Sequence, residues 1–176
     1  RRLADSMRAH LVADVPVGVL LSGGIDSGTL AALAALETPG KVSTFTIGFE
    51  ERGFDERDRA SAVARRYETD HHELVAHPNA VELLPTIAEV FDEPFSDHSA
   101  IPTYIVSRLA RQHLKVVLSG EGGDELFGGY NYYTGHLLAP RLRPAAALFR
   151  PLVERLPVST ASASTLDHRL KTFVRG

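Results

Sequence analysis

Residues 17–27 read Val17-Gly18-Val19-Leu20-Leu21-Ser22-Gly23-Gly24-Ile25-Asp26-Ser27. The first part is a β-branched and leucine run, long enough for one buried strand. Two adjacent glycines then turn the chain, and residues 29–36 strongly favour a helix because they are rich in Ala and Leu. The stretch therefore predicts a strand, a tight loop and a helix. Free N–H groups and the positive end of the helix dipole face outward at such a junction, so Ser22, Asp26 and Ser27 lie where an anion binds.

The loop matches neither of two common nucleotide-binding motifs. It has no Gly-Lys-Ser/Thr ending, as a Walker loop requires, and no Gly-x-Gly-x-x-Gly, as a dinucleotide fold requires. Ser22-Gly23-Gly24-Ile25-Asp26-Ser27 instead resembles the pyrophosphate loop of ATP-pyrophosphatase ligases, which cleave ATP between its α and β phosphates. From these residues alone, an ordinary glycine turn in an α/β domain stays an open alternative.

Composition narrows the class of protein. The 176 residues suit one domain, and the apolar fraction of 44% is enough for a core. A net charge of −3 without a basic block does not suggest nucleic-acid binding. No apolar run is long enough to span a bilayer. The chain lacks cysteine, which permits a cytoplasmic location, and it lacks a starting Met, so we expect a piece of a longer protein.

Strand and helix patterns alternate along the chain. Strands are predicted at 42–47, 69–75 and 116–118, and helices at 2–13, 56–66 (with Asp55 as N-cap), 79–91 and 99–113. Such alternation predicts a doubly wound parallel sheet, with ligands bound beyond the carboxyl ends of the strands. We expect one truncated domain, with a core at 1–135 and a helical, partly mobile extension at 136–176.

A second glycine loop follows the strand predicted at 116–118. It reads Ser119-Gly120-Glu121-Gly122-Gly123-Asp124-Glu125-Leu126-Phe127-Gly128-Gly129-Tyr130. This run resembles the synthetase domain of glutamine-dependent asparagine synthetases. Further stretches are similar to that family in order and spacing, over about residues 1–133: Phe45-Thr46-Ile47-Gly48-Phe49, Asp55-Glu56, His71-His72-Glu73, Asp92-Glu93-Pro94-Phe95 and Ser99-Ala100-Ile101-Pro102-Thr103.

The carboxylates of the two loops suit a metal ion. Asp26, Glu121 and Asp124 would crowd a triphosphate, and two like charges at about 4 Å repel by roughly 4 kcal/mol at an effective dielectric near 20. A helix dipole returns only about 0.3–1 kcal/mol per charge. Mg²⁺ bridging carboxylate and phosphate oxygens removes the conflict. We therefore assign Asp26 and Asp124 as Mg²⁺ ligands, as the resemblance also implies; the alternative for Asp124 and Glu125 is a pair of solvated turn acids.

The resemblance implies roles for the other loop residues. It implies that Glu121 helps to form the acyl-adenylate or handles ammonia, with Asp26 and Asp124 also catalytic. The residues that it implies for the nucleotide are Ser22, Gly23, Gly24 and Ser27 at the pyrophosphate, Leu20 and Ile47 at the adenosine, and Ser119 and Gly120 at the nucleotide and acyl-adenylate. Leu20 and Ile47 also suit the core.

Other polar residues carry weaker expectations. Asp97, Ser99 and Thr103 approach the acceptor amino acid on this interpretation, and Tyr130 hydrogen-bonds near the acyl site or is a buried turn residue. His71 and His72 are adjacent on a predicted strand, so they point to opposite faces and do not share a metal. The arginines of the helix at 56–66 are interpreted as a solvated face: Arg57, Arg59, Arg65 and Arg66.

The resemblance implies a ligase that uses ATP and Mg²⁺. It would adenylate the side chain of aspartate, release pyrophosphate, and amidate the product with ammonia from an N-terminal glutaminase domain of the same full-length chain. Open alternatives are a relative with another carboxylate acceptor (β-lactam, cyclic peptide or polysaccharide precursor) and a non-catalytic nucleotide-binding module. We expect no nucleic-acid or membrane partner and keep a homodimer open. The sequence leaves undecided the acceptor and the activity of this segment alone.

Overall fold

A computed structural model of the chain describes residues 1–49, 55–76, 80–93, 97, 99–130, 133 and 136–137. The chain divides into two compact units, Arg1–Glu121 and Gly122–Gly176. The boundary expected after residue 135 and most of the extension expected at 136–176 lie outside the described residues.

A four-stranded parallel sheet forms the centre of the first unit. Its strands are β1 (Val17–Leu20), β2 (Ser43–Gly48), β3 (Asp70–Val75) and β4 (Val116–Leu118), in the order β3-β2-β1-β4. All three pairings are parallel. Because β1 lies between β2 and β4, and parallel strands end at the same edge, the segments after β1 and after β4 leave the sheet side by side. The predicted parallel α/β fold is confirmed.

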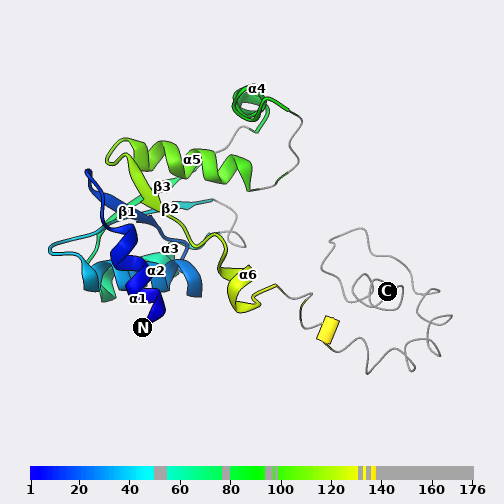
Figure 1. Ribbon diagram of the computed structural model, residues 1–176. Helices are drawn as coiled ribbons and strands as arrows, with labels where there is room; N and C mark the ends of the chain where they lie inside the picture. The colour runs from blue at the N-terminus through cyan, green and yellow to red at the C-terminus, as the bar shows by residue number, and fades with distance from the viewer. Residues whose placement is uncertain are drawn as a thin grey trace, which may run out of the picture. The chain divides into compact units, whose positions relative to one another are not determined.

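Helices cover both faces of this sheet (Figure 1). One face carries α1 (Arg2–His10), α2 (Ile25–Glu37) and α3 (Arg57–Arg66), and the other carries α5 (Ala100–Arg111), against which α4 (Ala80–Phe91) packs. The second unit contains α6 (Gly123–Phe127). Coverage of both faces explains why β1 reads as a continuous apolar run rather than as an alternating one.

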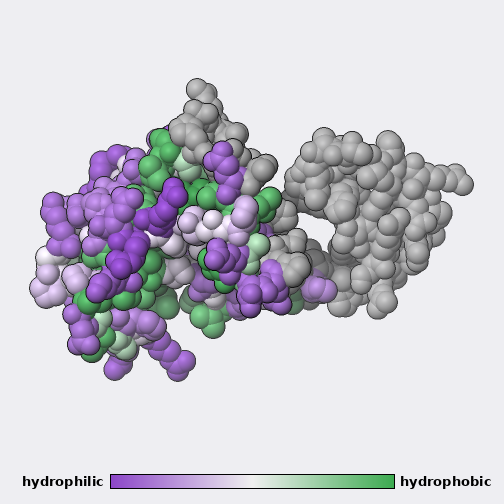
Figure 2. All heavy atoms as spheres, turned by 90° about the horizontal axis from the view of Figure 1, so that it is seen from above, coloured by the Kyte–Doolittle hydropathy of each residue, from purple (hydrophilic) through white to green (hydrophobic). Residues whose placement is uncertain are grey.

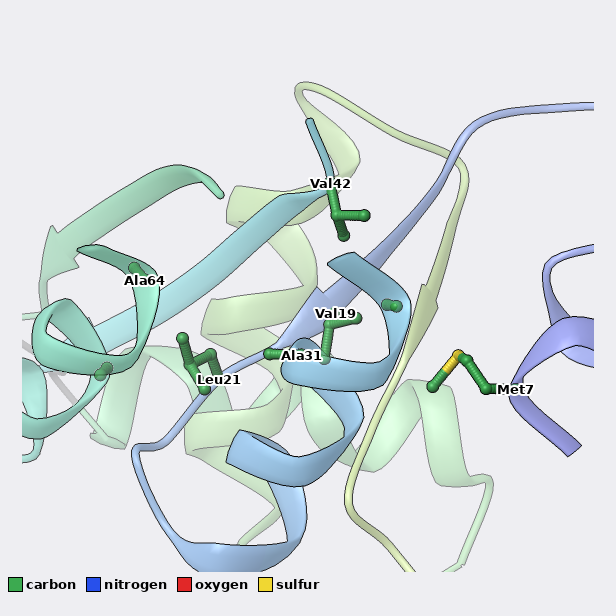
Figure 3. Close-up of a cluster of buried hydrophobic side chains, with 8 residues drawn as sticks. Met7, Val19, Leu21, Ala31, Val42 and Ala64 are labelled. Atoms are coloured by element: carbon green, nitrogen blue, oxygen red, sulfur yellow. The ribbon is translucent and has the colours of Figure 1, made fainter. Parts of the chain in front are cut away.

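The main core lies between the sheet and α1, α2 and α3. Figure 3 shows Ala31 of α2 close to Val19 and Leu21, with Met7 approaching from α1. Val19 and Ala31 are completely buried, and Leu21 is 2% exposed. Alanines in α2 and α3 leave room for these helices to approach the sheet closely. The full cluster is Met7, Val19, Leu21, Ala31, Ala34, Val42, Ala60 and Ala64.

The opposite face of the sheet has a different composition. Phe45 of β2 is fully buried there, and its ring stacks on His72 at a centroid distance of 5.1 Å. His72 in turn contacts His113, with ring centroids 3.9 Å apart.

On the surface of the molecule seen in Figure 2, hydrophobic and hydrophilic side chains are interspersed. Among the described residues, no helix is long and apolar enough to cross a membrane.

Several element boundaries differ from the prediction. The helix α2 begins at Ile25, ahead of the alanine-rich run, so that Asp26 lies in its first turn. The predicted N-cap of α3 is wrong: the N-cap is Glu56, and the carboxylate of Asp55 instead accepts the backbone N–H of Arg57 at 3.2 Å. The short helix α6 was not predicted, because its sequence is rich in glycine and was interpreted as a loop.

Candidate active site

The loop after β1 is closed by two serines. The hydroxyls of Ser22 and Ser27 are 2.9 Å apart, and the backbone N–H of Ser22 donates to Ser27 Oγ at 3.2 Å. Ser27 is only 6% exposed. The backbone N–H of Gly24 donates weakly to Ser22 Oγ at 3.4 Å. Ser27 therefore holds the loop in shape from inside, while Ser22 lies on the exposed side.

The first turn of α2 supplies the N–H groups for an anion. The first intrahelical bond runs from Gly28 N–H to the Gly24 carbonyl at 2.9 Å. The N–H groups of Ile25, Asp26 and Ser27 precede it and have no partner within the helix. The N-cap, Gly24, makes no side-chain capping bond. This turn thus presents several N–H donors at the positive end of the helix dipole. The half-buried carboxylate of Asp26 lies in the same turn.

Glycine at position 23 is required by its surroundings. Its φ angle is +76°, in the left-handed region that other residues rarely adopt. A Cβ atom placed there would lie 2.5 Å from Arg59 Cβ and 2.6 Å from Ala60 N. The loop after β1 therefore rests directly on the backbone of the first turn of α3.

The loop after β4 meets the N-terminus of α2. β4 pairs with β1 in the register Val17↔Val116 to Val19↔Leu118, so Ser119 and Gly120 leave the sheet at its carboxyl edge. A Cβ atom at Gly120 would lie 3.1 Å from Ser27 N and 3.3 Å from Asp26 Cβ. The two glycine loops are thus in contact through Gly120. Glu121 follows, exposed, with its N–H directed to Ser119 Oγ at 3.4 Å.

Leu20 and Ile47 lie near the carboxyl ends of β1 and β2, and both are half-buried. The backbone around them is tightly bonded: Leu21 N–H donates to the Phe45 carbonyl at 2.8 Å, and the Thr46 hydroxyl donates to the Leu21 carbonyl. Two adjacent strand ends are therefore held in one register. Their expected contact with adenosine stays a prediction.

A half-buried ion pair lies beside the end of β2. The guanidinium of Arg57 binds both carboxylate oxygens of Asp55, at 2.8 and 2.7 Å. The hydrogen bond to Arg57 holds the pKa of Asp55 below its usual value. A Cβ atom at Gly48 would lie 2.1 Å from Arg57 Nε, so the pair covers the backbone of that strand end. Arg57, predicted to be part of a solvated helix face, is half-buried, and its charge is paired with a carboxylate.

In the second unit, Asp124 lies in the first turn of α6. Gly122 before this helix and Gly128 after it both adopt the left-handed conformation. The Tyr130 hydroxyl donates to Glu125 Oε1 at 2.6 Å, and this bond lowers the pKa of Glu125. The backbone carbonyl of Asp124 accepts the N–H of Gly129 at 3.0 Å. The segment is thus folded back on itself.

The acceptor residues predicted near α5 organise the start of that helix. The carboxylate of Asp97 accepts the N–H of Ser99 at 2.8 Å, and the Ser99 carbonyl accepts the N–H of Thr103 at 2.9 Å. Thr103 is exposed. Their approach to an acceptor amino acid stays a prediction.

His71 and His72 point to opposite faces of the sheet, as expected. His71 Nδ1 lies 2.8 Å from the Thr44 hydroxyl, and burial lowers its pKa. His71 borders a hollow of about 570 Å³ that also touches Lys41 and Arg65, away from the carboxyl ends of the strands. No group of three or more His, Asp or Glu side chains suited to a metal occurs among the described residues.

The sequence comparisons with known proteins agree on one family. The family model described as asparagine synthase matches residues 1–174. A relative from Mycobacterium tuberculosis is 48% identical over 85% of this chain and 22% of its own length. The glutamine-hydrolyzing asparagine synthetase 1 of Bacillus subtilis is 45% identical over 73% of this chain and 20% of its own length.

A third relative is asparagine synthetase B of Escherichia coli, 35% identical over 74% of this chain and 26% of its own length. This chain thus spans about a fifth to a quarter of the length of these relatives. Among solved structures, an NH3-dependent NAD synthetase from Campylobacter jejuni aligns with a TM-score of 0.48 and 14% identity, over 74% of this chain and 58% of that chain. On the sequence matches, this chain belongs to the asparagine synthase family.

Proposed function

We propose that this chain is the ATP-binding, carboxylate-adenylating part of an asparagine synthetase. The aspartate side-chain carboxylate attacks the α-phosphate of ATP, a bond forms between carboxylate oxygen and phosphorus, and pyrophosphate leaves with the electron pair of the broken bond. Ammonia then displaces AMP and gives asparagine. The single observation that carries the proposal is the contact of Gly120 with the N-terminus of α2, in a chain of this family.

The nucleotide phosphates are assigned to the loop after β1 and the first turn of α2. Ser22, Gly23, Gly24 and Ser27 shape this loop, and the unpartnered N–H groups of α2 supply the donors. The Gly120 contact is tight, since a Cβ atom there would lie only 3.1 Å from Ser27 N. Backbone donors held in this way orient the phosphates without needing a flexible side chain.

We assign adenosine to the ends of β1 and β2, at Leu20 and Ile47, and the reacting centre to Ser119, Gly120 and Glu121. The exposed carboxylate of Glu121 adjoins Gly120, which suits a group that meets the acyl-adenylate or the incoming ammonia. A base in that role must lie within hydrogen-bond reach of the nucleophile.

The donor set of the two loops suits Mg²⁺. It offers carboxylate oxygens and neither thiolate nor imidazole, and Mg²⁺ typically binds one or two carboxylates together with substrate phosphates and water. We assign Asp26 and Asp124 as the residues that hold it. When bound, the ion would neutralise charge on the phosphate oxygens.

Ammonia is assigned to a glutaminase domain of the full-length chain, because the relatives from Bacillus subtilis and Escherichia coli are named as glutamine-hydrolyzing. The proposal includes a cytoplasmic location, which the cysteine-free sequence permits. A homodimer stays an open alternative that light scattering of the full-length protein would decide.

The test measures pyrophosphate release by the full-length protein with ATP, Mg²⁺ and ammonium chloride. We expect release that depends on aspartate and yields asparagine and AMP in equal amounts. If pyrophosphate release depends on a different carboxylic acid, that acid is the acceptor in place of aspartate. Binding of Mg·ATP without release in the presence of any tested acid would indicate a nucleotide-binding module and would overturn the proposal.

A further inference from the structure

The first turn of α3 lies against the phosphate loop proposed above. The peptide group joining Arg59 and Ala60 approaches Gly23 so closely that a Cβ atom there would lie 2.6 Å from Ala60 N and 2.8 Å from the Arg59 carbonyl carbon. Arg59 Cβ is equally close, at 2.5 Å. The side chain of Arg59 therefore starts at the loop itself.

The direction of the helix carries this side chain toward the carboxyl edge of the sheet. Side chains in an α-helix lean toward its N-terminus and cover the preceding turn. The N-terminus of α3 lies at that edge, because the side chain of Arg57 lies against Gly48 at the end of β2. Arg59, two residues later, leans toward the same edge from beside Gly23.

Arg59 has a charge available for a ligand. It is exposed, and within the described ranges no hydrogen bond or ion pair engages it. Arg57, in the same turn, by contrast donates from Nε and one terminal guanidinium nitrogen to the two carboxylate oxygens of Asp55. A triphosphate beside the carboxylates of Asp26 and Glu121 needs positive charge, and the loop after β1 contains no lysine.

We propose that Arg59 binds the β- and γ-phosphates of ATP and holds the leaving pyrophosphate. This inference rests on the proposed function. When the bond between the α-phosphorus and its bridging oxygen breaks, the electron pair stays on the pyrophosphate, and a guanidinium bound to two phosphate oxygens stabilises that charge. The positive end of α3 adds to the same field.

The test compares Arg59→Ala, Arg59→Lys and Arg66→Ala in the full-length protein. Arg66 is a matched control, because it is an exposed arginine in the last turn of the same helix. Binding of inorganic pyrophosphate and of AMP, each with Mg²⁺, is measured by calorimetry, alongside KM for ATP and kcat. AMP lacks the two phosphates assigned to Arg59.

We expect Arg59→Ala to weaken pyrophosphate binding about ten- to hundredfold, as for loss of a charge-assisted hydrogen bond. AMP binding should stay unchanged, Arg59→Lys should recover part of the loss, and Arg66→Ala should behave as wild type. Equal pyrophosphate affinity in Arg59→Ala and wild type would overturn the inference, as would an equal loss for AMP. If pyrophosphate binding depends on Arg59 but aspartate-dependent release is absent in wild type, the inference stands and the proposed function fails.

Discussion

Replacing Gly23 by alanine tests the contact between the first glycine loop and α3. The φ angle of +76° costs a non-glycine residue about 1–2 kcal/mol. The added Cβ would also lie 2.5–2.8 Å from atoms of residues 59 and 60, two of which are backbone atoms. Overpacking of this kind costs about 1–3 kcal/mol. The sum predicts a destabilisation of about 2–5 kcal/mol.

Gly40 provides the matched control. Its φ angle is +103°, but a Cβ atom there would meet nothing within 4 Å. Gly40→Ala therefore carries the backbone cost without the steric one, and Gly23→Ala should be less stable than it by about 1–3 kcal/mol. Thermal unfolding of the two full-length variants measures the difference. Equal midpoints would show that α3 does not rest on the loop, and would remove the ground for Arg59 as a phosphate ligand.

Three further predictions concern the metal, the loop and pH. Asp124→Ala should reduce aspartate-dependent pyrophosphate release at least about hundredfold and abolish its dependence on Mg²⁺ without changing the thermal midpoint; wild-type rates would contradict the metal assignment. Ser27→Ala removes both bonds to Ser22, so it should cost about 1 kcal/mol of stability and raise KM for ATP; an unchanged KM and midpoint would refute the bracing role. Burial lowers the pKa of His71 below 6.5, so the unfolded chain takes up its proton first and stability should fall as pH decreases through and below that value. In thermal unfolding between about pH 7.5 and about pH 5, His71→Gln should make stability depend less on pH. If the variant and the wild type show the same pH dependence, other groups cause it.

The sheet could be predicted because its signals are local. The strand predicted at residues 116–118 is β4 itself, and the apolar run from Val17 is β1. β-branched residues between turn signals indicate strands wherever they occur, and alternation with helices indicates parallel pairing. The beginning of α2 was placed too late, because Asp26, Ser27 and Gly28 have low helix propensity and only their position at the loop makes them helical.

The sequence by itself determined the chemistry of the two loops: glycines that permit tight turns, hydroxyls and carboxylates that suit phosphate and Mg²⁺, and a motif similar to one family. Only the tertiary structure decided which glycines are needed for close approach, and against which partner. Gly120 faces the N-terminus of α2, Gly23 faces α3, and Arg57 is bound to Asp55 while Arg59 is left exposed. The physical reason is that backbone propensity depends on neighbours along the chain, whereas these contacts join segments far apart in sequence. They exist only once β1 has paired with β4 and α3 has packed onto the sheet.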